Sequence, residues 1–179
     1  MPFTVSHVVA VWPLHKLQVL QVIPWSAFAI GAMAPDVFHF IGLAHLRWLT
    51  HSVTGLWLVN LPLVVLLTLL WLIVIRPAVV DLSPWWLRQR WQASIEARQA
   101  ELGGPRDPLS RRGLAAISVG GLLGAFSHLL IDAFTHGRSW GAWLFPALED
   151  ALGPLHWYGW LQYGASVLGL LILAVLFGR

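Results

Sequence analysis

One long uncharged segment restricts the fold of this chain more than any other feature. Residues 52–75, SVTGLWLVNLPLVVLLTLLWLIVI, contain no acidic or basic side chain. The segment exceeds the ~20 residues that a helix needs to cross a hydrocarbon core about 30 Å thick. Composition agrees, because 58% of the residues are hydrophobic and only 11% are charged, against roughly 25% charged in ordinary soluble domains. The segment is therefore predicted to be a spanning helix of a membrane protein.

Two further segments have spanning length. Residues 158–178 are uncharged, and residues 113–135 are apolar apart from a histidine and aspartate group, which must then face the protein interior. Gly120, Gly121 and Gly124 in the second segment are expected to allow a close contact between helices, since small residues let membrane helices approach. About three full spans are predicted.

The N-terminal region, residues 1–50, has a different pattern. Its apolar stretches TVSHVVAVWPL and IPWSAFAIGAMAP are each too short to cross the membrane alone. We expect a pair of short helices, packed as a hairpin or as a re-entrant pair that enters and leaves the membrane on the same side. The predicted fold is thus an all-α integral membrane helical bundle, with residues 1–179 forming a single membrane domain.

Charge predicts the orientation. Residues 76–112 carry most of the basic side chains, Arg76, Arg88, Arg90, Arg98, Arg106, Arg111 and Arg112, and the positive-inside tendency places this loop in the cytoplasm. Within it, SPWWLRQRWQASIEARQAELGG is expected to form an interfacial helix on anionic lipid. The bilayer is the expected partner, and nucleic acid is not, because no binding motif accompanies the charge. Many of the 12 Trp lie near predicted span ends, as in an aromatic belt.

The segment SHLLIDAFTH carries the clearest chemical signal. His128, Asp132 and His136 are spaced four residues apart, so they share one stripe of a helix. Two ligands at i and i+4 can bind one metal ion, and an ionisable residue inside a span costs at least ~2.5–3.5 kcal/mol, so it needs a partner. The alternative is a His128–Asp132 hydrogen bond that only ties helices together.

Topology brings other polar residues to the same membrane rim. If the helices on either side of residues 76–112 are antiparallel, then His51, Asp132, His136 and His156 belong to one layer. The N-terminal region adds His7, Asp36 and His39, each next to a short apolar segment. The chain has no Cys, so any metal must be bound by imidazole and carboxylate.

Four sequence blocks resemble a catalogued family. The start MPFTVSHVVAV and the blocks IGAMAPDVFHF, LTHSVTGLWLVNLPLVVLL and GAFSHLLIDAFTH are similar to successive blocks of a bacterial membrane family known as domain-of-unknown-function family 4184. The resemblance covers nearly the whole chain and implies a multi-pass protein of the bacterial cytoplasmic membrane. It implies kinship of fold more than chemistry.

A looser resemblance suggests a chemistry. The order His, Asp, His, then HxxxD and a further His is similar to the ligand order of zinc-dependent phospholipase C, related nucleases and membrane-bound metal-dependent hydrolases. It implies a metal site of His7, Asp36, His51, His128, Asp132 and His136, with Asp132 as the bridging carboxylate and Asp36 and Asp132 as catalytic carboxylates. The soluble enzymes also have a late HxxxE pair, which Trp157 to Trp160 replace after His156 here, so at most two ions, zinc being expected, are implied.

The hypothesis from sequence is therefore a metal-dependent hydrolase. Its site at the extracytoplasmic rim would act on a phosphoester or other ester of an amphiphilic, lipid-like substrate. Arg138 could neutralise a phosphate there, and His39 and His156 are additional candidates. The alternatives are a non-catalytic metal protein, a haem protein using His51 and His136, or a scaffold whose polar residues fix helix packing. Packing of the spans in a homodimer is left open.

Overall fold

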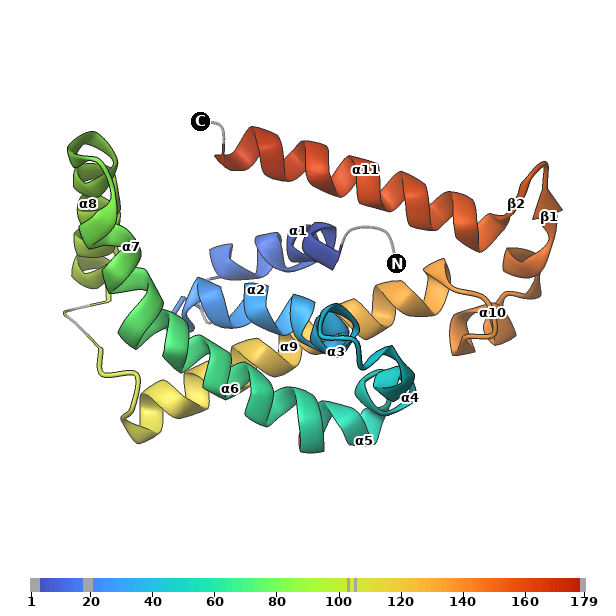
Figure 1. The fold of residues 1–179 in the computed structure, drawn as a ribbon, viewed down its shortest axis with the longest axis horizontal. Coiled ribbons are helices and arrows are strands. Elements are labelled where there is room, and N and C mark those ends of the chain that lie inside the picture. The colour runs from blue at the N-terminus through green and yellow to red at the C-terminus, as the bar shows by residue number, and fades with distance from the viewer. Residues whose placement is uncertain (1–3, 18–20, 103, 105, 178–179) are drawn as a thin grey trace.

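The described chain folds into a bundle of helices with one short two-stranded hairpin (Figure 1). The structure is a computed structural model, and it describes residues 4–17, 21–102, 104 and 106–177. Within these residues, three helices are long and apolar enough to cross a membrane: Val53–Leu82, Arg111–Thr135 and Trp157–Leu176. The predicted all-α fold with three spans is confirmed. Gly178, the last residue of the third predicted span, lies outside the described residues.

The first long helix is continuous but not uniform. It consists of α5 (Val53–Gly55), η6 (Leu56–Asn60), α6 (Leu61–Leu70), η7 (Trp71–Ile75) and α7 (Arg76–Leu82), and it extends beyond residue 75, where the uncharged segment ends. The segments η6 and η7 are wider π-turns. Each precedes a proline, Pro62 or Pro77, whose ring would clash with the carbonyl four residues earlier in a regular α-helix. Widening the turn relieves that clash.

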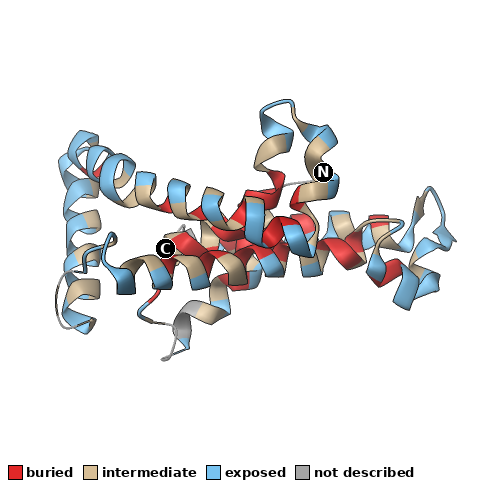
Figure 2. Cartoon of the chain, turned by 90° about the horizontal axis from the view of Figure 1, so that it is seen from below, coloured by how far each residue is buried: buried red, intermediate tan, exposed pale blue. Residues whose placement is uncertain are grey.

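The N-terminal region forms short helices, as predicted. They are η1 (Thr4–His7), α1 (Val8–Val11), η2 (Trp12–Lys16), α2 (Trp25–Met33), η4 (Ala34–Asp36), α3 (Val37–Phe40), η5 (Ala44–Leu46) and α4 (Arg47–Thr50). Helix α2 packs against α6 and, most extensively, against α9 (Arg111–Thr135). Its residues Ala27, Phe28 and Ala32 are buried, and the buried part of the bundle is concentrated here (Figure 2). A helix too short to span therefore forms the centre of the bundle.

Glycines allow α2 and α9 to approach backbone to backbone. A Cβ atom at Gly124 would lie 2.3 Å from the Phe28 carbonyl oxygen, and one at Gly31 would lie 2.3 Å from the Gly121 carbonyl oxygen. A Cβ at Gly121 would also lie 2.3 Å from the Val64 side chain of α6. Any larger residue would force the helices apart. The predicted close helix contact at the glycines of α9 is confirmed.

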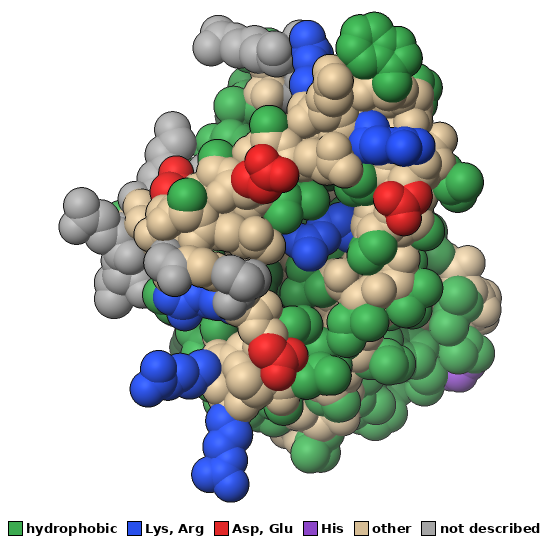
Figure 3. Space-filling view, turned by 90° about the vertical axis from the view of Figure 1, so that its left-hand side faces the viewer, with side chains coloured by type: hydrophobic (Ala, Val, Ile, Leu, Met, Phe, Trp, Pro, Cys, Tyr) green, Lys and Arg blue, Asp and Glu red, His purple; other side chains and the backbone are tan. Residues whose placement is uncertain are grey.

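The two ends of the bundle differ in character. At one end α8 (Trp85–Glu101) has no buried residue and runs across the direction of α9 and α11 (Trp157–Phe177) (Figure 1). Acidic and basic side chains gather at this end (Figure 3). The other end carries α10 (Trp140–Leu144), η8 (Pro146–Glu149) and the hairpin of β1 (Ala151–Leu152) and β2 (Leu155–His156). Trp140, Trp143, Trp157 and Trp160 are exposed there, as expected for residues at headgroup depth.

Candidate metal centre

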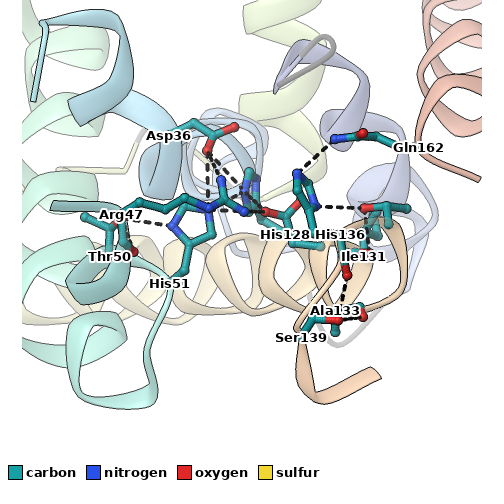
Figure 4. A network of polar contacts seen from close by, with 12 residues as sticks. Asp36, Arg47, Thr50, His51, His128, Ile131, Ala133, His136, Ser139 and Gln162 are labelled. Carbon is teal, nitrogen blue, oxygen red and sulfur yellow. Dashed lines mark hydrogen bonds and ion pairs between the residues drawn. The ribbon is translucent and has the colours of Figure 1, made fainter. Parts of the chain in front are cut away.

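Buried histidines and aspartates meet where η1, η4, α4 and α9 converge (Figure 4). The side chains that meet, called the polar cluster below, are His7, Asp36, Arg47, His51, His128, Asp132 and His136. The structure thus brings together all six residues that the sequence resemblance implied as ligands, and it adds an arginine. His128 is fully buried, and Asp36 and Asp132 are only 3% and 6% exposed. Buried charges of this kind need a counter-charge.

The Nε2 atoms of His51 and His128 lie close to one oxygen of each aspartate. The Nε2 atom of His51 lies 3.3 Å from His128 Nε2, 3.3 Å from Asp36 Oδ1 and 3.3 Å from Asp132 Oδ2. The Nε2 atom of His128 lies 3.6 Å from Asp36 Oδ1 and 3.6 Å from Asp132 Oδ2. Ligands held at ~2.0–2.1 Å from a tetrahedral zinc ion are about 3.3–3.4 Å from one another. These five distances are close to the ligand spacings at a zinc ion, and Asp36, His51 and His128 form one group of three that could hold a metal ion.

The hydrogen bonds around these atoms fix which lone pairs face inward. His128 Nδ1 lies 2.8 Å from the Ala32 carbonyl oxygen, which can only accept, so Nδ1 donates and Nε2 of the neutral ring carries the lone pair. The Thr50 hydroxyl donates to the Arg47 carbonyl oxygen and lies 2.9 Å from His51 Nδ1, which places the lone pair of His51 on Nε2 as well. Two imidazole lone pairs and two carboxylate oxygens consequently point at one another, an arrangement that a cation stabilises.

Asp36 is oriented in the same way. The Thr4 hydroxyl donates to Asp36 Oδ2 at 2.7 Å, which leaves Oδ1, a buried atom without a hydrogen-bond partner among the described residues, facing the two histidines. Asn60 Nδ2 donates to the Thr50 carbonyl oxygen at 2.7 Å and thereby ties the turn that carries His51 to the first long helix. Such outer hydrogen bonds are the usual means by which proteins orient metal ligands.

A second group of ligand atoms surrounds the other oxygen of Asp132. His136 Nδ1 lies 3.4 Å and His7 Nε2 lies 3.8 Å from Asp132 Oδ1, and the rings of His7 and His128 stack at 4.1 Å. His7 Nδ1 is buried and has no hydrogen-bond partner within the described chain. Gln162 of α11 contacts His136 Nε2 at 2.9 Å. Asp132 can thus bridge two positions, one at each carboxylate oxygen.

The orientation of the Gln162 amide decides the part that His136 plays. With the amide nitrogen donating to Nε2, His136 Nδ1 carries the hydrogen and donates to Asp132. The reversed amide, which has the same shape, makes Nδ1 a ligand atom. Gln162 was not among the residues singled out from the sequence, because a single glutamine in an apolar span gives no distinctive pattern.

Arg47 is the cluster residue that the sequence reasoning missed. Its Nη2 donates to Asp132 Oδ2 at 2.6 Å, and its Nη1 lies 3.7 Å from Asp36 Oδ1. Both oxygens also lie close to the Nε2 atoms of His51 and His128. The side chain is 35% exposed, so it reaches the cluster from its rim. The sequence could have indicated Arg47, because it lies one helical turn before His51 in RWLTH, and this spacing puts both side chains on one face of a helix.

The charge states of the flanking groups follow from burial and hydrogen bonding. Burial, together with the neighbouring His128, lowers the pKa of His7 to about 4, so its ring is neutral at pH 7. Burial raises the pKa of Asp36, but the adjacent rings of His51 and His128 and the hydrogen bond from Thr4 outweigh it and hold the pKa below the ordinary value of 3.8. A neutral imidazole and an ionised carboxylate are the forms that bind metals.

The structure places the additional candidates outside the polar cluster. His39 is exposed and its ring contacts Phe40. His156 is exposed, contacts the Glu149 carbonyl oxygen through Nδ1 at 2.6 Å and stacks on Tyr158. Arg138 lies in a turn with a φ of 56° and donates its backbone N–H to Glu149. Proximity in sequence to a cluster residue did not bring any of them to the site.

A cavity adjoins the second group of ligand atoms. It measures about 230 Å³, far more than the roughly 10–15 Å³ that one water molecule needs. Its polar end is formed by His7, Asp36, Asp132 and His136, and its remaining wall consists largely of apolar residues from α1, α9 and α11. The cluster is therefore open to a molecule on the side of Asp132 Oδ1.

Fold and site together define a helical protein with three helices of membrane-spanning length and a buried histidine–aspartate cluster near one end of the bundle. A family model described as "Domain of unknown function (DUF4184)" matches residues 1–179, the whole chain. The chain belongs to this family. Searches among curated proteins and among solved structures found no match.

Proposed function

We propose that the polar cluster binds one or two divalent metal ions, with zinc as the expected ion, and that the protein is a membrane-bound metal-dependent hydrolase of an amphiphilic ester. The observation that carries this proposal is the set of five distances of 3.3–3.6 Å among His51, His128, Asp36 and Asp132. Nitrogen and oxygen ligands at these spacings suit zinc better than calcium or magnesium, which take more oxygen ligands.

The two positions suggest two different tasks. Asp36, His51 and His128 surround the first position, and Asp132 Oδ2 lies 3.3 Å from His51 Nε2 at its edge. The second position, beside Asp132 Oδ1 and His7, faces the cavity, and a catalytic position keeps such an open side. A metal ion there would supply acidity, lowering the pKa of a water molecule to around 7. Asp132 bridges the two positions, and Asp36 helps to hold the first.

Arg47 supports an anionic substrate. Its guanidinium contacts both carboxylates and is partly exposed at a small pocket that it shares with His51, outside the larger cavity, so an anion can reach it from that side. Arginine binds phosphate oxygens through paired N–H donors. A phosphoester is accordingly the favoured substrate class.

Charge supports the proposed membrane side. The arginines of residues 76–112 lie at the end of the bundle opposite the polar cluster, at α8 and the start of α9 (Figures 1 and 3). With this basic end in the cytoplasm, the cluster lies at the extracytoplasmic rim of a bacterial cytoplasmic membrane. The exposed tryptophans of α10 and the start of α11 fit headgroup depth on that side.

The geometry favours metal over haem. His51 Nε2 and His136 Nδ1 approach the two oxygens of the same carboxylate, Asp132, at 3.3 and 3.4 Å, so a carboxylate rather than the space for a macrocycle lies between them. A purely structural role predicts that the cluster contributes to stability without binding an ion. That alternative predicts no zinc-dependent hydrolysis in the experiment below.

The test of hydrolysis uses detergent-purified protein loaded with zinc and, in parallel, stripped by a chelator. Each form is assayed on 4-nitrophenyl phosphodiesters, with Asp36→Asn as the site variant and Asp150→Asn, an exposed acidic residue, as the matched control. We expect zinc-dependent release of 4-nitrophenol by the wild type and by Asp150→Asn, and a loss of about 100-fold or more in Asp36→Asn. Equal rates in wild type and Asp36→Asn, or no hydrolysis at full zinc occupancy, would contradict the proposal.

A further inference from the structure

The cavity beside the polar cluster has a shape and a depth that point to its occupant. It is lined by Val9 and Ala10 of α1, by Ile131 of α9, and by a row of residues along α11 from Gln162 to Ile172. That row is about 15 Å long at 1.5 Å per residue. Half of a hydrocarbon core ~30 Å thick is the depth of one leaflet. The lining of this cavity, called the groove below, thus extends along α11 by about the depth of one leaflet, and residues of the ligand cluster form part of its wall.

The groove opens sideways. Ala165 and Leu168 of α11 and Ala10 of α1 line it and are also exposed on the surface of the protein. Ala165 lies about 12 Å from Trp157, the start of the spanning segment, at 1.5 Å per residue, which is well inside the apolar layer. An opening at that depth faces hydrocarbon chains rather than water.

The wall of the groove becomes more polar toward the cluster. Leu168 and Ile172 form its apolar part, whereas Gln162, Thr135 and His136 surround the end next to Asp132. Gly169 lets α11 pass close to η1, because a Cβ there would lie 2.8 Å from the Ser6 Cβ. The exposed lining residues Ala10, Ala165 and Leu168 place the opening on the bilayer side, and His7, Asp132 and His136 line the same cavity.

We infer that the groove between α1, α9 and α11 holds one hydrocarbon chain of a membrane lipid, with the phosphoester attached to that chain placed at the polar cluster. The substrate enters sideways from the leaflet. This inference rests on the proposed function and specifies its substrate: the chain must be joined directly to the reacting phosphate, because residues of the ligand cluster line the groove itself.

The experiment compares two phosphodiesters with the same reacting group, methyl 4-nitrophenyl phosphate and hexadecyl 4-nitrophenyl phosphate. Ala165→Trp fills the groove, and Val167→Trp places the same side chain on a neighbouring exposed residue of α11 outside it. We expect the wild type to prefer the hexadecyl ester in kcat/KM by about 100-fold, from burial of the chain. Ala165→Trp should remove most of that preference by lowering kcat/KM for the hexadecyl ester far more than for the methyl ester, and Val167→Trp should change neither rate.

The outcomes separate the groove from the hydrolase. Ala165→Trp with both rates unchanged, or with both reduced equally, would overturn the groove. If the wild type hydrolyses neither ester, the proposed function fails, and hexadecyl phosphate with a photoactivatable diazirine in its chain tests the groove by itself. Crosslinks at Leu168 and Ile172 that disappear in Ala165→Trp would support the groove. Equal crosslinking of wild type and Ala165→Trp would overturn it.

Discussion

The two halves of α9 form their contacts by opposite means. In the first half, Gly121 and Gly124 meet α2 and α6 because they have no side chains, so backbone packs directly on backbone. In the second half, His128 and Asp132 meet other segments through their side chains, by polar contacts with His51 and by stacking of the His128 ring on His7. One half defines where the helices lie, and the other depends on that placement to bring ligand atoms within 3.6 Å of one another. Within one helix, the glycines thus determine the packing of the fold, and the histidine and aspartate side chains form the candidate site.

The glycine half should give the largest effect when changed. Gly124→Leu would drive a side chain into the Phe28 carbonyl, since even a Cβ atom would lie 2.3 Å from it. Backbone cannot move aside as a side chain can, so we expect a cost at or above the ~1–3 kcal/mol typical of overpacking. The variant should elute as aggregate in size-exclusion chromatography in detergent, or melt well below the wild type.

The matched control is Gly164→Leu on α11, where an added Cβ meets nothing within 4 Å. It should elute and melt like the wild type. If both leucine variants behave alike, the contact between α2 and α9 does not hold the bundle together.

Changes in the polar half should lower metal affinity more than they lower the stability of the fold. Thr4→Val removes the hydroxyl that donates to Asp36 Oδ2 at 2.7 Å while keeping the shape of the side chain. Loss of an outer hydrogen bond to a metal ligand typically lowers metal affinity 10- to 100-fold. We expect that loss in a zinc competition assay with a chelating dye, together with a nearly unchanged melting temperature. Thr54→Val, on the exposed side of α5, should retain wild-type affinity; a similar loss there would show that the effect is not specific to Asp36.

Acid should weaken zinc binding through His51. Burial lowers the pKa of His51, but hydrogen bonds to Asp132 and Asp36 raise it more, so its pKa lies above the ordinary 6.5. Below that raised pKa, zinc must displace a proton from His51, and affinity should fall about tenfold for each pH unit. His7, with its pKa lowered to about 4, adds a further loss only near that pH. A zinc affinity that stays constant from about pH 8 to about pH 5 would contradict this assignment of His51 as a ligand.

Removing Arg47 should give the smallest change in zinc affinity, and this change should be an increase rather than a loss. Its guanidinium contacts Asp132 Oδ2 and Asp36 Oδ1, so it competes with a metal ion for the same oxygens. Arg47→Gln should therefore bind zinc several-fold more tightly, up to about tenfold, from the loss of one charge-assisted hydrogen bond. The metal-free variant should melt at a lower temperature, because two buried carboxylates lose their counter-charge. Arg98→Gln on α8 is the control, and weaker zinc binding in Arg47→Gln would show that Arg47 instead helps to hold the ligands.

Features that follow from local sequence patterns could be predicted from the sequence. Features that depend on contacts between distant segments could not. The uncharged run of residues 52–75, the small residues of α9 and the four-residue spacing of His128, Asp132 and His136 are local patterns with direct physical meaning. The pairing of Arg47 with Asp132 joins residues 85 positions apart, and the contact between Gln162 and His136 depends on how α11 packs. His156, placed in the predicted layer by topology alone, lies outside the polar cluster in strand β2, where it pairs with Ala151 and contacts Glu149.

The most direct test is the elemental metal content of detergent-purified protein, measured for the wild type, Asp132→Asn and Asp81→Asn. Asp132 contacts both ligand groups, whereas Asp81 is exposed at the opposite end of the bundle. We predict about one to two zinc, manganese or iron ions per chain in the wild type and Asp81→Asn, and almost none in a folded Asp132→Asn. A folded wild type without metal, or an Asp132→Asn protein that keeps its full metal content, would contradict a metal centre at the polar cluster.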